Sequence, residues 1–251
     1  MPSKPGLAAV GAIAAVGTLA GTAAAVHATP APARHVAATE QPTNGIIAGG
    51  RAPSTPWMVQ LHLGDDRQWQ ECSGELISSE WVLTARHCIE GDGDMSVYFS
   101  NSTRNLGEPT RGDRLIAAPR GDIALVHLET PHEIDEYPML AINYRPTEGD
   151  EGRIMGYGLR GDRVRSTGLF QADVDVLGAD RDLFGGESVH IKGVNGAANH
   201  GDSGGPLVID GKIVAVCSMG ELDDPGHDAQ SGSYYANLGQ ATSWIRRTTG
   251  L

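Results

Sequence analysis

Residues 201–206 read Gly-Asp-Ser-Gly-Gly-Pro, and this hexapeptide decides how the rest of the chain is interpreted. A serine hydroxyl is a weak nucleophile at neutral pH unless a base removes its proton and backbone N–H groups stabilise the oxyanion that forms. Glycines on either side of Ser203 let the backbone approach a substrate carbonyl closely. The hexapeptide therefore predicts a nucleophilic Ser203, with the N–H groups of Gly201 and Ser203 forming an oxyanion hole.

A nucleophilic serine of this kind needs a histidine base and an acid that orients the histidine. Residues 83–88 read Leu-Thr-Ala-Arg-His-Cys, and residues 121–126 read Gly-Asp-Ile-Ala-Leu-Val. His87, Asp122 and Ser203 follow in the chain order of the chymotrypsin-like class of triads. On these segments the sequence resembles the trypsin/chymotrypsin-like serine peptidases of the bacterial secreted type, over roughly residues 46–251.

The resemblance implies an all-β fold of two six-stranded antiparallel β-barrels packed around a catalytic cleft, with a short C-terminal helix. The barrels are expected at roughly 46–140 and 141–251, with the boundary near 137–146, so that His87 and Asp122 come from the first barrel and Ser203 from the second. Short apolar segments separated by turn residues agree with this class of fold. We expect strands at 57–63, 72–78, 81–84, 97–99, 123–128, 152–158, 174–177, 189–191, 207–209 and 212–218, and a helix at 239–247.

A second resemblance concerns activation. Residues 46–50 read Ile-Ile-Ala-Gly-Gly, similar to the Ile-Val-Gly-Gly terminus that the family exposes on activation. It implies that the new α-amino group of Ile46 pairs with Asp202, since a buried carboxylate and a buried ammonium are each costly alone. Gly45 precedes the cleaved bond, so the activating peptidase is expected not to be trypsin-like. A terminus at Ile47 remains an alternative.

Substrate recognition is predicted from one segment and from two separate pocket positions. Residues 216–220 read Val-Cys-Ser-Met-Gly, which resembles the family segment that pairs with the substrate backbone as an added strand. Ala197 stands where the family has its pocket floor, and Ser233 would also line the pocket. Both are neutral, so we expect neutral or apolar residues before the scissile bond. The full substrate-binding set is Ala197, Ala198, Asn199, His200, Cys217, Ser218, Met219, Gly220 and Ser233.

The three cysteines suggest one disulfide. Cys72 and Cys88 flank the His87 segment sixteen positions apart. A bond between them would contribute roughly 3 kcal/mol and requires an oxidising compartment. Cys217 ends the apolar run 213–217 and is expected to be a buried thiol.

The N-terminal residues are typical of a targeting segment. Lys4, the apolar run 7–26 and the small-residue site at 26–28 predict a signal peptide over residues 1–28 and a secreted, extracellular protein. A membrane anchor is the alternative for that run. Residues 29–45 have proline and alanine without periodicity, which predicts a short propeptide or linker.

Composition limits the partners. The net charge of −12 disfavours nucleic acid as a partner. We expect a monomer that acts on protein or peptide substrates and meets an activating peptidase, with no cofactor. We predict no metal, because the acidic residues 221–224 are typical of a solvated loop. A non-catalytic binding protein on the same fold and an esterase are the alternatives, but the complete triad in this chain order favours a serine endopeptidase.

Overall fold

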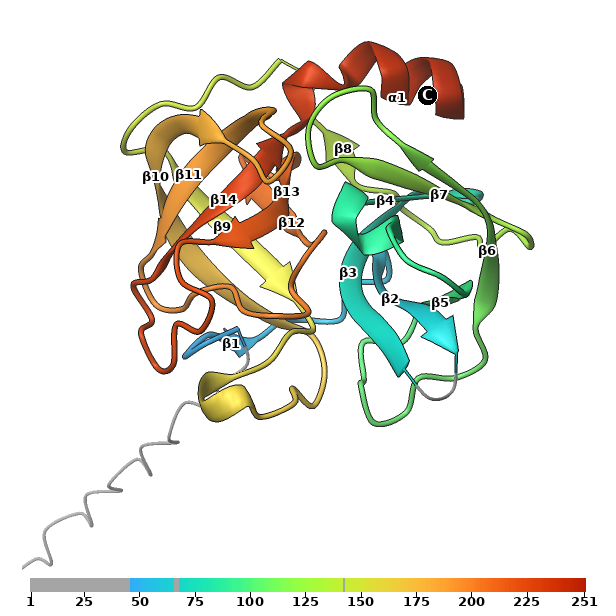
Figure 1. The fold of residues 1–251 in the computed structure, drawn as a ribbon, viewed down its shortest axis with the longest axis horizontal. Coiled ribbons are helices and arrows are strands. Elements are labelled where there is room, and N and C mark those ends of the chain that lie inside the picture. Colours follow the sequence, from blue (N-terminus) through green and yellow to red (C-terminus); the bar gives the residue numbers. More distant parts are fainter. Residues whose placement is uncertain (1–45, 66–67, 142) are drawn as a thin grey trace, which may run out of the picture. The chain divides into compact units, whose positions relative to one another are not determined.

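The computed structural model describes residues 46–65, 68–141 and 143–251. The predicted signal peptide (1–28) and the propeptide or linker (29–45) lie outside these residues. The described chain consists mainly of short antiparallel strands, which form two barrels (Figure 1).

The first barrel is a closed sheet in the order β2-β3-β4-β7-β6-β5. Apolar side chains alternate along these strands, so one face of the sheet fills the barrel interior. Its strands are β2 (Met58–Asp65), β3 (Gln68–Ser78), β4 (Trp81–Thr84), β5 (Asp94–Tyr98), β6 (Thr110–Ala117) and β7 (Ala124–Leu128). The interior includes Val59, Leu61, Leu76, Val82, Val97 and Val126.

The second barrel follows the order β10-β11-β14-β13-β12-β9 and closes through pairing of β9 with β10. Its strands are β9 (Glu151–Gly156), β10 (Phe170–Arg181), β11 (Glu187–Gly193), β12 (Pro206–Ile209), β13 (Lys212–Gly220) and β14 (Gly232–Asn237). Two short strands extend this sheet. β1 (Gly50–Arg51) pairs with β10, and β8 (Met139–Leu140) runs parallel to β13. Residues 139–140 thus already pair with the second barrel.

A separate apolar cluster joins the barrels. It combines Ile77, Leu83 and Leu125 of the first barrel with Ile213, Val216 and Ala236 of the second. The C-terminal helix α1 (Thr242–Thr249) adds Ile245 to the same cluster and ends at Gly250, whose φ of +79° suits glycine. Helix α1 therefore packs on residues from both barrels.

The expected fold class is confirmed: the structure has two closed six-stranded antiparallel barrels and a short C-terminal helix. The helix begins at Thr242 rather than at 239, because residues 238–240 form the 3-10 helix η3 (Leu238–Gln240). Strands β1, β6, β8 and β14 were not predicted, and β10 is much longer than the expected 174–177. No helix within the described ranges has the length and apolar character needed to cross a membrane.

Candidate active site

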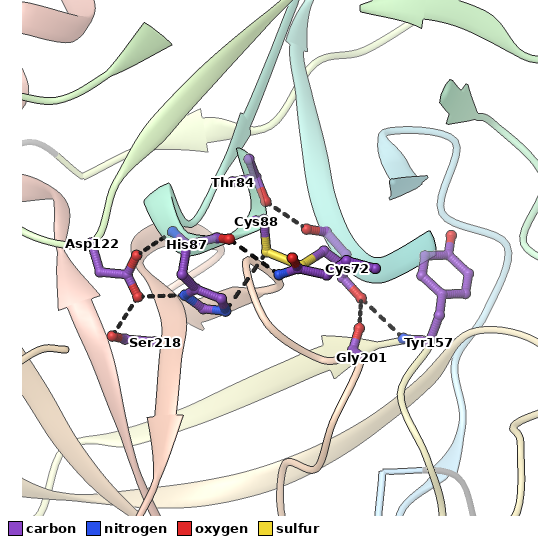
Figure 2. The surroundings of a disulfide bond; sticks show 10 residues. Cys72, Thr84, His87, Cys88, Asp122, Tyr157, Gly201 and Ser218 are labelled. Carbon is purple, nitrogen blue, oxygen red and sulfur yellow. Dashed lines mark hydrogen bonds and ion pairs between the residues drawn. A yellow bond between two sulfur atoms is a disulfide. The ribbon is translucent and has the colours of Figure 1, made fainter. Parts of the chain in front are cut away.

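His87 and Asp122 are joined by two hydrogen bonds (Figure 2). His87 lies on the 3-10 helix η1 (Arg86–Ile89) directly after β4, and Asp122 lies just before β7. His87 Nδ1 is 2.7 Å from Asp122 Oδ2, and the backbone N–H of His87 donates to Asp122 Oδ1 at 2.9 Å. The carboxylate therefore fixes both the orientation of the imidazole and the main chain that carries it.

Asp122 is completely buried, and its remaining bonds come from the second barrel. The hydroxyl of Ser218 donates to Asp122 Oδ2 at 2.6 Å, and the N–H of Asp122 donates to Asp182 Oδ2 at 3.0 Å. Buried carboxylates in proteins are normally satisfied in this way. The sequence had placed Ser218 in substrate binding only, and Asp182 had no role.

The predicted disulfide is present. Cys72 on β3 is bonded to Cys88 on η1, with the two Cα atoms 6.1 Å apart. The sulfur of Cys88 lies 3.8 Å from His87 Nε2, and Gln70 Nε2 donates to the carbonyl of His87 at 3.1 Å. The disulfide thus ties the segment carrying His87 to the long strand β3.

The same cysteines bear on metal binding. Within the described ranges, Cys72, His87 and Cys88 form the one group of three or more His, Cys, Asp or Glu residues whose ligand atoms lie within 4.8 Å of one another. Both sulfurs are used in the disulfide, so neither offers a thiolate ligand.

The loop that carries Ser203 is packed between the barrels. The N–H of Ser73 on β3 donates to the carbonyl of Ser203 at 2.8 Å, and the N–H of Gly204 donates to the carbonyl of Cys217 at 2.8 Å. Gly204 has a φ of +77°, and a Cβ atom there would lie 2.1 Å from Thr84 Oγ1. The close approach of the loop to β4 therefore requires glycine at this position.

The hydroxyl of Ser73 also links the two barrels, through hydrogen bonds to the backbone of Gly201 and Tyr157. It donates to the carbonyl of Gly201 at 2.9 Å and accepts the N–H of Tyr157 at 3.1 Å (Figure 2). Gly201 has a φ of +92°. One side chain of the first barrel therefore holds two backbone segments of the second.

Asp202 is buried immediately before Ser203. Its Oδ1 accepts the N–H of Gly158 at 2.8 Å, and its Oδ2 accepts the N–H of Asn199 at 2.9 Å. Burial raises the pKa of Asp202 to about 7, although these two hydrogen bonds oppose the shift. Ile46 is also buried, in the core of the second barrel, with a φ of +37° that is unusual for a β-branched residue.

His87 and Ser203 line one cavity of about 500 Å³. Most of the predicted substrate-binding residues line it as well: Ala198, Asn199, His200, Cys217, Ser218, Met219 and Gly220. Ala197 and Ser233 are each 2% exposed and are not among its lining residues. The sequence did not identify the other members: Leu183, Leu222, Asp223 and Pro225. These four lie in loops whose approach to the cavity depends on the folded barrels.

The polar groups of this cavity are mostly paired. Asn199 Oδ1 accepts the N–H of His200, while Asn199 Nδ2 is buried without a partner among the described residues. His200 Nε2 lies 2.8 Å from the carbonyl oxygen of Asp223, whose carboxylate is 3.7 Å from Arg163. Burial raises the pKa of Cys217, so the predicted buried thiol stays protonated at neutral pH.

Comparison with known proteins gives a consistent result. Residues 46–245 match the family model described as Trypsin. A protein named Uncharacterized peptidase from Corynebacterium glutamicum (strain R) is 30% identical over 235 residues, which cover 90% of this chain and 80% of that protein. Brachyurin from Leptuca pugilator is 28% identical over 231 residues, which cover 82% of this chain and 99% of that one.

Among solved structures, the chain is similar to neuropsin, described as a serine protease expressed in the limbic system of mouse brain. The TM-score is 0.65 and the sequence identity is 25%. The match covers 78% of this chain and 95% of the neuropsin chain.

Proposed function

The chain belongs to the trypsin family of serine peptidases, and we propose that its endopeptidase activity uses His87, Asp122 and Ser203 as the catalytic triad. The observation that carries this proposal is the pair of hydrogen bonds from His87 to Asp122, beside a cavity that His87 and Ser203 line together. It favours catalysis over the non-catalytic binding protein considered above.

The proposed reaction begins with proton transfer from Ser203 to His87. Because the Nδ1–H of His87 donates to Asp122, the lone pair of Nε2 is available as the base. Ser203 Oγ bonds to the substrate carbonyl carbon, and the N–H groups of Gly201 and Ser203 stabilise the oxyanion. His87 then protonates the amine as the C–N bond breaks. A water molecule, deprotonated by His87, then attacks the acyl carbon. The bond to Ser203 Oγ breaks, His87 returns the proton to Oγ, and the acid product leaves.

We also propose that cleavage between Gly45 and Ile46 activates the protein. Two observations support this step. The buried carboxylate of Asp202 has a raised pKa, so a cation beside it would be strongly favourable. The φ of +37° at Ile46 is unfavourable for a β-branched residue in a continuous chain. This angle exists only while Gly45 is bonded to Ile46, so cleavage of that bond removes the unfavourable conformation. The activating peptidase would have to accept glycine before the scissile bond.

For the substrate, the proposal is a neutral or apolar residue before the scissile bond. Ala198, Cys217 and Met219 give the cavity uncharged walls, and the carboxylate of Asp223 already lies near Arg163. A peptide library incubated with the enzyme cut before Ile46 should show cleavage mainly after neutral or apolar residues. Dominant cleavage after arginine or lysine would contradict this assignment of the pocket.

We also propose that the protein is secreted and monomeric, with domain boundaries at residues 28, 45 and about 140. The disulfide Cys72–Cys88 supports an oxidising compartment.

The decisive experiment is labelling with a fluorophosphonate probe, which reacts with an activated serine. The parent protein, cut before Ile46, should be labelled and should hydrolyse peptides. Ser203→Ala should abolish labelling, and His87→Ala should reduce it by at least about 1,000-fold, because the base is lost. Equal labelling of the parent and the Ser203→Ala protein would refute the assignment of the nucleophile.

A further inference from the structure

The turn between β10 and β11, residues 182–186, contacts the acid of the proposed triad. Asp182 at its start is 4% exposed. Its Oδ1 accepts the N–H groups of Phe184 and Gly186 at 3.0 and 2.8 Å, and its Oδ2 accepts the N–H of Asp122 at 3.0 Å. One carboxylate oxygen therefore holds the turn itself, and the other reaches across to the first barrel.

The approach of the two segments is very close. Gly121 has a φ of +74°, and a Cβ atom at this position would lie 2.6 Å from Asp182 Oδ2. Gln240 Nε2 lies 3.4 Å from the same oxygen and also donates to the carbonyl of Glu187 at 2.7 Å. The carboxylate of Asp182 is thus confined between the Gly121–Asp122 backbone and a side chain from the C-terminal region.

Two further contacts fasten the same turn to the active site. The N–H of Leu183 donates to Ser218 Oγ at 3.1 Å, and that hydroxyl donates in turn to Asp122 Oδ2. The guanidinium of Arg86, the residue before His87, lies 4.2 Å from the ring centre of Phe184. The turn therefore contacts the backbone of Asp122 directly, reaches its carboxylate through Ser218, and contacts the helix that carries His87.

We propose that Asp182 is a positioning residue for Asp122, an inference that rests on the proposed triad. Asp122 orients His87 through bonds of 2.7 and 2.9 Å, so a small displacement of Asp122 misaligns the base relative to Ser203. Misplacements of about 1 Å are enough to reduce catalysis by roughly 100-fold. Asp182 does not line the cavity, so its effect should fall on kcat and not on KM.

The two roles of the carboxylate can be separated by substitution. Asp182→Asn keeps a carbonyl oxygen for the N–H groups of the turn but directs an NH₂ group toward the N–H of Asp122, where two donors face each other. Asp182→Ser keeps a hydroxyl that can accept from the turn but is too short to reach Asp122. The control is Asp150→Asn, because Asp150 accepts the hydroxyl of Tyr144 at 2.7 Å elsewhere in the second barrel.

The test uses the full domain cut before Ile46, with fluorophosphonate titration to count active sites. Both Asp182 variants should show kcat per titrated site lowered by about 10- to 100-fold, with KM within about twofold of the parent. The ¹H resonance of the proton between His87 Nδ1 and Asp122 should also shift. Asp150→Asn should leave kcat and this resonance unchanged.

Two results would overturn the inference. The first is a kcat per titrated site within twofold of the parent in both Asp182 variants. The second is an equal loss of kcat in Asp150→Asn, because a general effect on the second barrel would then explain the loss in the Asp182 variants. If the parent itself showed no Ser203-dependent labelling, the proposed triad would fail and the positioning role with it. Normal labelling of the parent with unaffected Asp182 variants would reject the positioning role alone.

Discussion

Glu75 on β3 is completely buried, and neither of its carboxylate oxygens has a hydrogen-bond partner among the described residues. Burial raises the pKa of Glu75 well above its usual value, because the charged form loses its hydration without compensation. The side chain is therefore neutral in the folded protein at mildly acidic pH. As the pH rises, the folded protein retains this proton while the unfolded chain releases it, so folding becomes less favourable.

The sign of this effect can be tested with Glu75→Met. The unfolded chain loses the proton near pH 4.5, while the folded protein retains it up to the raised pKa. The free energy of unfolding should therefore fall as the pH rises through this interval. Glu75→Met should remove that decline and stabilise the protein by about 1–3 kcal/mol at pH 8.

Thermal unfolding at pH 5 and pH 8 in the inactive Ser203→Ala protein measures the difference. Glu80→Gln, at an exposed position two residues after β3, is the matched control and should retain the pH dependence of the parent. An unchanged pH dependence in Glu75→Met would show that Glu75 has another means of stabilising its charge.

Among the secondary-structure elements, helix α1 packs on residues of both barrels, and Ile245 is its buried side chain. Ile245 is buried in the cluster that contains Leu83 of the first barrel and Val216 of the second. Ile245→Ala should lower the free energy of unfolding by about 2–5 kcal/mol, because it leaves a cavity in this cluster. Urea unfolding gives the value, with Arg247→Ala on the exposed face of α1 as the control. A loss below about 1 kcal/mol would mean that the helix contributes little to holding the barrels together.

For the entire protein, the proposed activation predicts a stability difference that depends on pH. In the uncut chain, the raised pKa of Asp202 means that stability is lost as the pH rises from about 4 to 7. An ammonium group at Ile46 would offset this loss in the cut form. The cut form should therefore gain stability over the uncut form between pH 5 and pH 8, by up to about 4 kcal/mol.

This comparison is made in the Ser203→Ala protein to prevent self-digestion. Removing an N-terminal fusion directly before Ile46 yields the cut form, and removing it before Ile47 yields the control with the shifted terminus. Only the form that begins at Ile46 should show the pH-dependent gain. An equal gain in the Ile47 form would support the alternative terminus, and no gain in either would contradict the pairing with Asp202.

The fold class was predictable from the sequence because three local motifs carry the resemblance to the family that has this fold, and the residues proposed to react lie within these motifs. The segments around His87, Asp122 and Ser203 carry their residue types in a recognisable order. Strand β6 was missed because its sequence, Thr-Arg-Gly-Asp-Arg-Leu-Ile-Ala, has too few apolar residues at its start to show the alternation of a half-buried strand. Backbone pairing with β5 and β7 holds this segment as a strand.

The supporting residues of the site could not be predicted, because their roles depend on contacts between distant segments. Asp182 precedes Leu-Phe-Gly-Gly and has the sequence context of an ordinary turn residue, yet it bonds to Asp122, sixty positions earlier. Glu75 is a charged residue, a type that is almost never fully buried unless it is paired. It is buried instead, which the local pattern does not reveal.

The division of the site between the barrels also has a consequence for biosynthesis. His87 and Asp122 leave the ribosome first, and Asp182 and Ser203 follow sixty or more positions after Asp122. Under the proposed mechanism, a nascent chain carries the base and its acid without a nucleophile until translation has passed Ser203. A nascent chain that has not yet reached Ser203 therefore cannot form the acyl-enzyme.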